Sequence, residues 1–381
     1  MPVTIRTFFG WRRVYFVTKR QQPSPITLKS LQSLAIIAIV VAVGQVTLGG
    51  VVRATGSGLG CPDWPLCYGS IIPPLNSAAL IEYSHRFSGS ILGILVFALA
   101  IVSFLRYRFD RWLVIPATSA AVLVLVAGGL GGLTVVTELE WWLRLLHLGV
   151  AEMIICCLAV VFVASRYKMD NNLKMSISIN CSSALLTMSM LSLFGLILYG
   201  SYMVGQGYGT SCGTWPLCDG SILPFREPYL VHMLHRIMAV LVGIIISIVA
   251  ISVIYREEQW SIKKWLAAVL ISLFITQGVV GAITVWSGFT PLMKSVHLSL
   301  ATMVWLSLSL LSALQWVSRS DDSHKMTLNT KDKGDMQVMP QNSVGSSLIL
   351  DYIALTKPRI ILLLLITALG GMVLASGGLP D

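Results

Sequence analysis

Charged residues are scarce in this chain: Asp, Glu, Lys and Arg make up only 12% of its 381 residues. A soluble domain carries about twice that share, so an ordinary soluble globular protein is excluded. Seven cysteines are too few for a disulfide scaffold. Hydrophobic residues, by contrast, reach 55%, which indicates a chain embedded in a lipid bilayer. The net charge of +10 does not indicate a nucleic-acid partner, because the basic residues cluster in short segments between apolar runs.

Long apolar runs occupy most of the chain. A membrane-spanning helix needs about 20 mostly apolar residues, and nine stretches meet this requirement. They lie at 32–52, 83–104, 112–136, 142–164, 181–204, 230–254, 264–286, 292–316 and 358–376. The sequence therefore predicts an all-α integral membrane protein. Eight transmembrane helices are expected to form two tandem four-helix bundles, and one extra transmembrane helix follows near the C-terminus.

Basic residues concentrate at one end of these predicted helices. Of the 27 Lys and Arg residues, 21 lie in the first thirty residues or after the second, fourth, sixth and eighth predicted helices. Cytoplasmic segments are enriched in Lys and Arg, so this end and the N-terminus are predicted to be cytoplasmic. The first apolar run has full span length and lacks an obvious cleavage site, so it is not a signal peptide.

The two halves of the eight-helix region repeat one another. The loop GCPDWPLCYGSIIP at 60–73 recurs as SCGTWPLCDGSILP at 211–224, and three further motifs recur with the same offset of 150 or 151 residues. Such constancy indicates a tandem duplication. We divide the chain into an N-terminal cytoplasmic segment, an N-terminal half, a C-terminal half, a polar linker and a single-helix tail. These parts span 1–30, 31–166, 180–317, 318–350 and 351–381.

Four histidines follow the duplication. His85 and His147 lie 62 residues apart, as do His235 and His297, and each opens an even-numbered predicted helix. All four are expected at similar depth near the outer face, where imidazole pairs suit bis-axial ligation of haem. Zinc would find only two clear ligands in each half. For any single histidine, a hydrogen-bonded polar residue or a proton relay is the alternative.

A basic residue lies directly after, or three residues before, each of these histidines. The four are Arg86, Arg144, Arg236 and Lys294. Charge-assisted hydrogen bonds from them would hold the haem propionates toward the outer surface. The alternative for each is interfacial snorkelling.

One position breaks the repeat. Three residues before the first histidine of each pair, the N-terminal half has Glu82 and the C-terminal half has His232. A carboxylate on the helix face of an axial ligand is costly near the membrane unless it is used. We therefore predict that the N-terminal half is reactive, with Glu82 catalytic, and that the C-terminal half keeps a permanent haem. Helix-end charge is the alternative.

The cysteines form two matched pairs, Cys61/Cys67 and Cys212/Cys218, each within one predicted outward loop. Disulfides persist outside the cytoplasm, and one bridge per loop is the simplest of three connectivities. A structural staple is favoured, while a redox role stays open because the loops cover the histidine sites.

These residues resemble the haem A synthases of the cysteine-bearing bacterial type. The motifs EYSHRFSG, CPDWPLC, CGTWPLC, MLHR and HLSLA carry the resemblance, which covers about 30–317. It implies a multi-pass enzyme of the bacterial cytoplasmic membrane that oxidises a ring methyl of haem O to a formyl group, giving haem A for terminal oxidases. Glu82, His85 and His147 would form the substrate site, and His235 and His297 would ligate the iron of haem b.

The tail at 351–381 resembles the opening helix of haem O synthase, the protohaem IX farnesyltransferase that makes this substrate. The aspartate-rich diphosphate-binding motif of that family is absent. The resemblance implies a fusion of consecutive pathway enzymes cut short, and we assign the tail no activity. Haem O synthase, the lipid bilayer and an unidentified electron donor or acceptor are the expected partners, with no nucleic acid among them.

Two other functions compete with this one. A non-enzymatic di-haem b-type membrane electron carrier fits the four histidines equally well, but Glu82 and the asymmetry of the halves favour the enzyme. A membrane thiol–disulfide oxidoreductase would use the cysteine loops. Their Cys-x5-Cys spacing differs from the Cys-x-x-Cys spacing typical of that chemistry.

Overall fold

The computed structural model describes residues 4–5, 12–13, 25–168, 173–175, 181–257 and 261–319. Eight helices in this part of the chain are long and apolar enough to span a membrane. They are α1 (Pro25–Ala54), α2 (Ser77–Tyr107), α3 (Arg111–Val136), α4 (Trp141–Tyr167), α5 (Cys181–Gly205), α6 (Glu227–Arg256), α7 (Ile262–Trp286) and α8 (Pro291–Gln315). Short 3-10 turns η1 (Ser57–Leu59) and η2 (Tyr208–Thr210) follow α1 and α5. The short strands β1 (Thr4–Ile5) and β2 (Arg12–Arg13) pair antiparallel, as do β3 (Leu173–Met175) and β4 (Val317–Arg319).

The prediction of an all-α integral membrane protein is confirmed, and the chain is a multi-pass protein of the lipid bilayer. Each of the first eight predicted spans coincides with one helix. The helix α1 begins at Pro25, inside the predicted N-terminal segment, because proline fits the first turn of a helix. The ninth predicted span at 358–376, the tail and nearly all of the linker lie outside the described residues.

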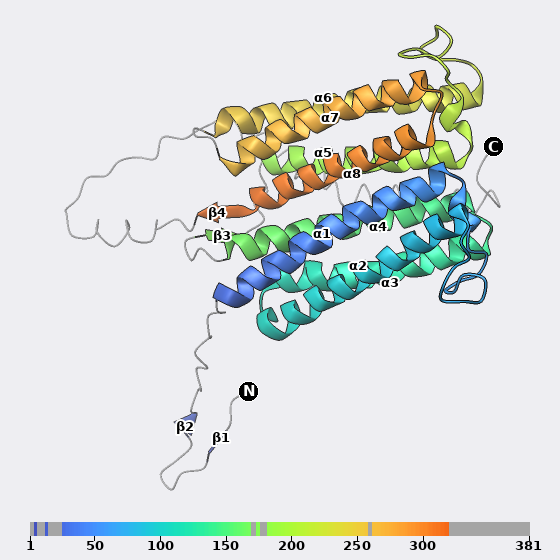
Figure 1. The fold of residues 1–381 in the computed structure, drawn as a ribbon. Helices are drawn as coiled ribbons and strands as arrows, with labels where there is room; N and C mark the ends of the chain where they lie inside the picture. Colours follow the sequence, from blue (N-terminus) through green and yellow to red (C-terminus); the bar gives the residue numbers. More distant parts are fainter. Residues whose placement is uncertain are drawn as a thin grey trace, which may run out of the picture. The chain divides into compact units, whose positions relative to one another are not determined.

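Each four-helix half is a closed ring of packed helices. In the first half α1 packs on α2, α2 on α3, α3 on α4 and α4 on α1, and α5 to α8 repeat this order. Contacts of α1 with α8, α4 with α8 and α4 with α5 join the two rings. As Figure 1 shows, α2 and α3 therefore lie on one outer side and α6 and α7 on the other. The two halves belong to one compact unit, Met1–Ser320.

The outer helices expose apolar side chains along their length. Ile94 of α2, Leu125 of α3 and Val240 of α6 are 71%, 62% and 64% exposed. An apolar surface this extensive is unfavourable in water and favourable against acyl chains. The outward faces of the outer helices are therefore the lipid-facing surface.

A buried carboxyl group lies where the two halves meet. Glu152 of α4 is fully buried, and its Oε1 accepts a hydrogen bond of 2.7 Å from Thr302 Oγ1 of α8. The indole Nε1 of Trp305 donates to the Glu152 carbonyl at 2.7 Å. Glu152 and Thr302 occupy equivalent positions of the duplication. The repeated helices α4 and α8 thus meet through different residues, and this difference supplies the hydrogen bond.

Replacing Thr302 by Val is expected to destabilise the protein by about 1–3 kcal/mol, because it leaves a buried acceptor without its donor. Thermal unfolding in detergent measures the effect as a lower melting temperature. Thr302→Ser keeps the hydroxyl and is the matched control, expected to stay near the parent protein. An equal loss of stability in both variants would show that the Thr302 methyl group, and not its hydrogen bond, stabilises the contact between α4 and α8.

Candidate functional site

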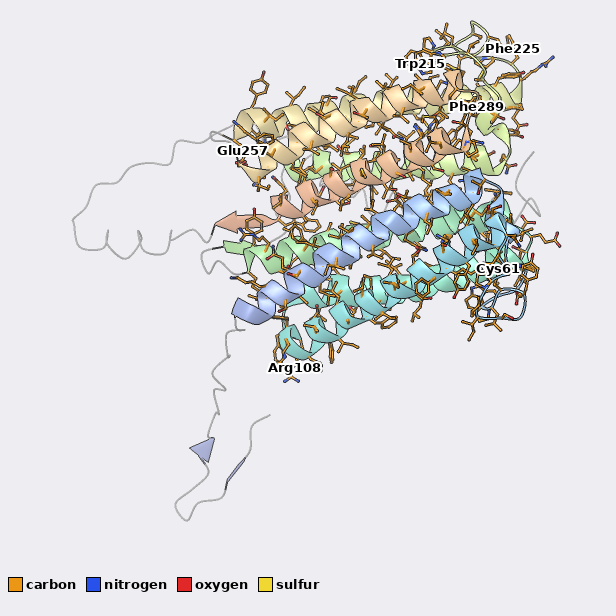
Figure 2. All side chains as sticks on the ribbon, viewed as in Figure 1. Cys61, Arg108, Trp215, Phe225, Glu257 and Phe289 are labelled. Atoms are coloured by element: carbon orange, nitrogen blue, oxygen red, sulfur yellow. A yellow bond between two sulfur atoms is a disulfide. The ribbon has the colours of Figure 1, made fainter. Side chains whose placement is uncertain are left out.

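The predicted site residues gather at one end of the helices, which we call the disulfide end because both cysteine loops lie there. Figure 2 shows Cys61, Trp215 and Phe289 at this end, and Arg108 and Glu257 at the opposite end. The even-numbered helices begin at the disulfide end, and the four histidines lie in the second or third turn of these helices.

In the N-terminal half the two predicted ligands face each other. The ring centres of His85 on α2 and His147 on α4 lie 6.4 Å apart, with an angle of 64° between the ring planes. Two imidazoles on opposite faces of one metal ion, each bound at about 2 Å, have ring centres roughly 6 Å apart. This pair therefore already has the separation that axial ligation of a haem requires.

Hydrogen bonds hold both rings of this pair. His147 Nδ1 lies 3.0 Å from the Ala127 carbonyl, and a proton shared there leaves Nε2 free to bind a metal. The amide Nε2 of Gln45 lies 3.1 Å from His85 Nδ1 and donates to the His85 carbonyl at 2.9 Å. Gln45 of α1 therefore positions the ring of His85. Leu196 takes its place in the second half, so this contact exists only in the first.

A glycine on a neighbouring helix lies against each ring of the first pair. A Cβ atom added at Gly49 of α1 would lie 3.0 Å from His85 Cε1, and one added at Gly131 of α3 would lie 3.4 Å from His147 Cε1. The first distance is tighter than about nine in ten real Cβ contacts, and the second is at the short end of ordinary contact. A larger residue would thus push the imidazole out of place.

The C-terminal half repeats these glycine contacts. A Cβ atom at Gly200 of α5 would lie 3.1 Å from His235 Cε1, and one at Gly281 of α7 would lie 3.2 Å from His297 Cε1. The Nδ1 atom of His235 is buried and finds no hydrogen-bond partner among the described residues. The ring of His297 interacts with the backbone of Gln277, the equivalent of Ala127 in the duplication. The second pair thus has the same glycine contacts as the first, and it also fits haem.

Other metal sites fit the structure less well. Within the described residues, no group of three or more His, Cys, Asp and Glu side chains could hold a metal ion. Zinc sites usually need at least three protein ligands, whereas haem iron takes only two axial ones. The paired histidines therefore favour haem over zinc.

Each cysteine loop is closed by its own disulfide. Cys61 is bonded to Cys67 and Cys212 to Cys218, with Cα–Cα separations of 4.7 and 5.1 Å. Both bonds are buried, and each loop contains a cis Trp–Pro peptide. The bridges staple each loop to itself, with no bridge between the loops.

A carboxylate organises the first loop. Asp63 accepts hydrogen bonds from the backbone amides of Tyr68 at 2.6 Å and Gly69 at 2.7 Å. The pKa of Asp63 is lowered from its ordinary value, mainly because the Gly69 amide donates a hydrogen bond to the carboxylate. In the second loop Thr214 has this role and accepts from the Asp219 amide at 3.0 Å. The two loops thus keep one turn geometry with different acceptors.

Arg86 joins the first loop to α2. Its Nη1 donates to the carbonyls of Asp63 and Leu66 at 2.6 and 2.7 Å, and its Nη2 donates to the Cys61 carbonyl at 2.8 Å. Its Nε donates to Glu82 Oε1 at 2.9 Å in an ion pair. The loop and Glu82 therefore engage all three guanidinium nitrogens of Arg86.

Arg236 repeats this arrangement in the second half. Its Nη1 donates to the carbonyls of Thr214 and Pro216 at 2.8 and 2.9 Å. Its Nη2 lies 3.4 Å from His232 Nε2. Arg86 and Arg236 therefore anchor the loops, and their pairing with haem propionates stays a prediction. Among the described contacts, the side chains of Arg144 and Lys294 donate no hydrogen bond to a loop carbonyl.

Glu82 and His232 occupy equivalent places in these two arrangements. Both are buried, at 6% and 5% exposure, and each contacts the arginine four residues later. The carboxylate of Glu82 is thus the main chemical difference between two otherwise matched surroundings. It lies one helical turn from His85.

The chain matches the cytochrome oxidase assembly protein family COX15-CtaA over residues 32–309 and 224–376. Several curated relatives carry the name Heme A synthase. The relative from Alkalihalophilus pseudofirmus is 24% identical over 289 residues, covering 74% of this chain and 97% of the relative. Relatives from an Exiguobacterium species and Bacillus pumilus are each 29% identical, over 286 and 273 residues. These cover 74% and 68% of this chain and 93% and 86% of the relatives.

Proposed function

The chain belongs to the cytochrome oxidase assembly protein family COX15-CtaA, and from this we propose that it is a haem A synthase with one substrate site and one permanent haem site. The reaction converts a ring methyl of haem O to the formyl group of haem A. The observation that carries the proposal is the pair of matched histidine sites, of which only the first has a carboxylate beside it.

The N-terminal half, 31–166, is the proposed substrate site. His85 and His147 bind the iron of haem O on its two faces, and Glu82 acts on the ring edge. Gln45 and the Ala127 carbonyl orient the two imidazoles so that they approach the iron correctly. This orientation matters because an axial ligand that turns freely loses binding energy.

The C-terminal half, 180–317, is the proposed haem b site, in which His235 and His297 would hold the haem iron. When bound, haem b supplies one-electron redox chemistry. Glycines on α5 and α7 leave room for the two imidazoles, and Tyr199 stacks on His235 with ring centres 6.4 Å apart and planes at 6°. This packed, half-buried setting suits a group that stays bound through many turnovers.

Orientation and partners complete the proposal. The disulfide end faces the outside and the N-terminus is cytoplasmic, because the basic segments lie at the opposite end. Arg144 and Lys294 pair with haem propionates. Haem O synthase supplies the substrate, as the resemblance of the tail at 351–381 to that family indicates, and an electron donor or acceptor in or beside the membrane completes the cycle.

Gly49→Ala is expected to weaken haem binding in the N-terminal half, because the new Cβ would lie 3.0 Å from Cε1 of His85 and displace that ring. Overpacking typically costs about 1–3 kcal/mol, which is roughly 5-fold to 150-fold in affinity. Titration of the full-length protein with haem, followed by its Soret absorbance, measures the change. Gly44→Ala is the matched control on the same helix, since nothing lies within 4 Å of a Cβ there.

The same comparison serves the second half. Gly281→Ala should weaken haem b binding, while Gly278→Ala, with nothing within 4 Å of its added Cβ, should not. Equal effects of the contacting and the non-contacting glycine in either half would contradict the proposed role of these contacts.

Identification of the bound haems tests the function itself. Non-covalent haems are extracted from the purified protein and separated by chromatography and mass. Haem O or haem A beside haem b supports the synthase, and incubation with haem O should yield haem A. Haem b alone in both halves, with no conversion, would support the di-haem electron carrier instead.

A further inference from the structure

Two arginines come together at the disulfide end of the N-terminal half. Arg53 of α1 and Arg144 of α4 are near enough to interact electrostatically. The Nε atom of each is buried and has no hydrogen-bond partner in the described part of the chain. Neither belongs to an ion pair among the described residues. The carboxylate that acts on Arg144 is Glu140, which is exposed and more distant than an ion pair.

Both arginines stand on the rim of the proposed substrate site. Arg53 follows Gly49, the glycine against the His85 ring, by four residues, so it lies on the same helix face about 6 Å nearer the disulfide end. Arg144 precedes His147 by three residues and lies about 4.5 Å nearer that end on its own face. The Cα atoms of both arginines therefore lie nearer the disulfide end than those of Gly49 and His147, on the helix faces that carry these two residues.

The guanidinium of Arg53 is held in position by the other half of the protein. Its Nη2 donates to the Ser201 carbonyl at 2.9 Å and its Nη1 lies 3.4 Å from Ser201 Oγ. Ser201 is buried and directly follows Gly200, the glycine against His235. These bonds use the terminal nitrogens and leave Nε free. The equivalent of Arg53 in the duplication is Val204, so only the N-terminal half has a second arginine.

The two guanidinium groups repel each other, and their buried Nε donors lack acceptors. Both features are costly unless an anion lies between the groups. The planar guanidinium group suits a carboxylate in particular, since it can offer parallel hydrogen bonds. We infer that Arg53 and Arg144 together bind one propionate carboxylate of the haem in the N-terminal half. The inference rests on the proposed function, because it takes the haem between His85 and His147 as the source of that carboxylate.

This contact has a consequence for selectivity. Two axial ligands alone leave the flat macrocycle free to rotate about the axis between them. A carboxylate fixed on the rim by Arg53 and Arg144 removes that rotation and determines which ring methyl lies toward Glu82. Arg53 is thus a positioning residue, acting on the orientation of the substrate and not on its chemistry.

A comparison of two ligands tests the inference. Full-length protein that already holds haem b in its C-terminal half is titrated with haemin and with haemin dimethyl ester, which lacks the free carboxylates. The parent protein should bind the free acid about 10-fold to 100-fold more tightly than the ester. Arg53→Gln should lose most of this preference, because it weakens binding of the free acid alone. The preference of Arg53→Lys should lie between those of the parent protein and Arg53→Gln. Val204→Ala, at the equivalent position, should keep the full preference.

The outcomes separate this inference from the proposed function. Retention of haem b shows that each variant is folded. If the parent protein binds no second haem, the proposed function fails. If it binds a second haem but Arg53→Gln keeps the preference for the free acid, or weakens acid and ester equally, then Arg53 does not bind the carboxylate and the inference is overturned.

Discussion

Replacing His235 or His297 by Ala is expected to abolish the tightly bound haem b of the purified protein. Each change removes one of two axial ligands, and the glycine beside the ring offers no side chain to replace it. The reduced-minus-oxidised spectrum and the haem content per protein measure the loss, which should be nearly complete. The protein should still insert in the membrane, since the apolar surfaces of α6 and α8 are unchanged.

Two further histidine variants act as controls for this loss. His85→Ala should leave haem b largely in place, because His85 lies in the other half. His232→Ala should also retain it, because His232 contacts Arg236 and the Cys212 amide on the loop side of α6. If His85→Ala removed as much haem b as His235→Ala, the assignment of haem b to the C-terminal half would be wrong.

The spans and the histidine pairs were predictable from the sequence, because each depends on a one-dimensional signal. A helix that crosses lipid needs an unbroken apolar run of fixed length, so the first eight runs coincide with α1 to α8. The duplication adds a constant offset that reveals which histidines are equivalent. His85 and His147 lie at the same end because each is near the start of an even-numbered helix, and the even-numbered helices run in the same direction.

Arg86 shows what adjacency in sequence does not reveal about the contacts of a side chain. It directly follows His85, and this closeness led us to expect a propionate contact. Consecutive residues on a helix, however, point about 100° apart, so Arg86 turns toward the cysteine loop and binds its carbonyls. Arg144, three residues from His147, shares the face of its ligand and remains a propionate partner in the proposal.

The glycine contacts and Gln45 were not predicted, because what lies against a ring depends on how two helices pack. A signal was nevertheless present for the glycines. Gly131 and Gly281 are equivalent in the duplication, as are Gly49 and Gly200, and glycine kept at both copies inside a helix indicates close approach. Gln45 offered no such signal, since its equivalent is Leu196. Residues unique to one half have to be found in the structure.

Glu82 is the residue on which the enzymatic function depends most. Conversion of a methyl group to an alcohol and then an aldehyde removes protons and electrons in stages, through electron-poor carbon centres. A carboxylate near the ring edge can accept those protons or stabilise the developing positive charge. The ion pair with Arg86 at 2.9 Å holds Glu82 beside the site. In the C-terminal half His232 has no such charge to offer.

Glu82→Gln is therefore expected to retain both haems and to lose haem A formation, by about 100-fold to 10,000-fold if the group acts as a proton acceptor. Gln preserves the side-chain shape and can still accept the hydrogen bond from Arg86, so the loop should keep its position. Chromatography of extracted haems should show haem O or its alcohol derivative accumulating in place of haem A. His232→Gln, the matched change in the other half, should leave haem A formation near the parent level. A normal haem A yield from Glu82→Gln would instead identify the carboxylate as a partner of Arg86 in anchoring the loop, and it would show that Glu82 is not catalytic.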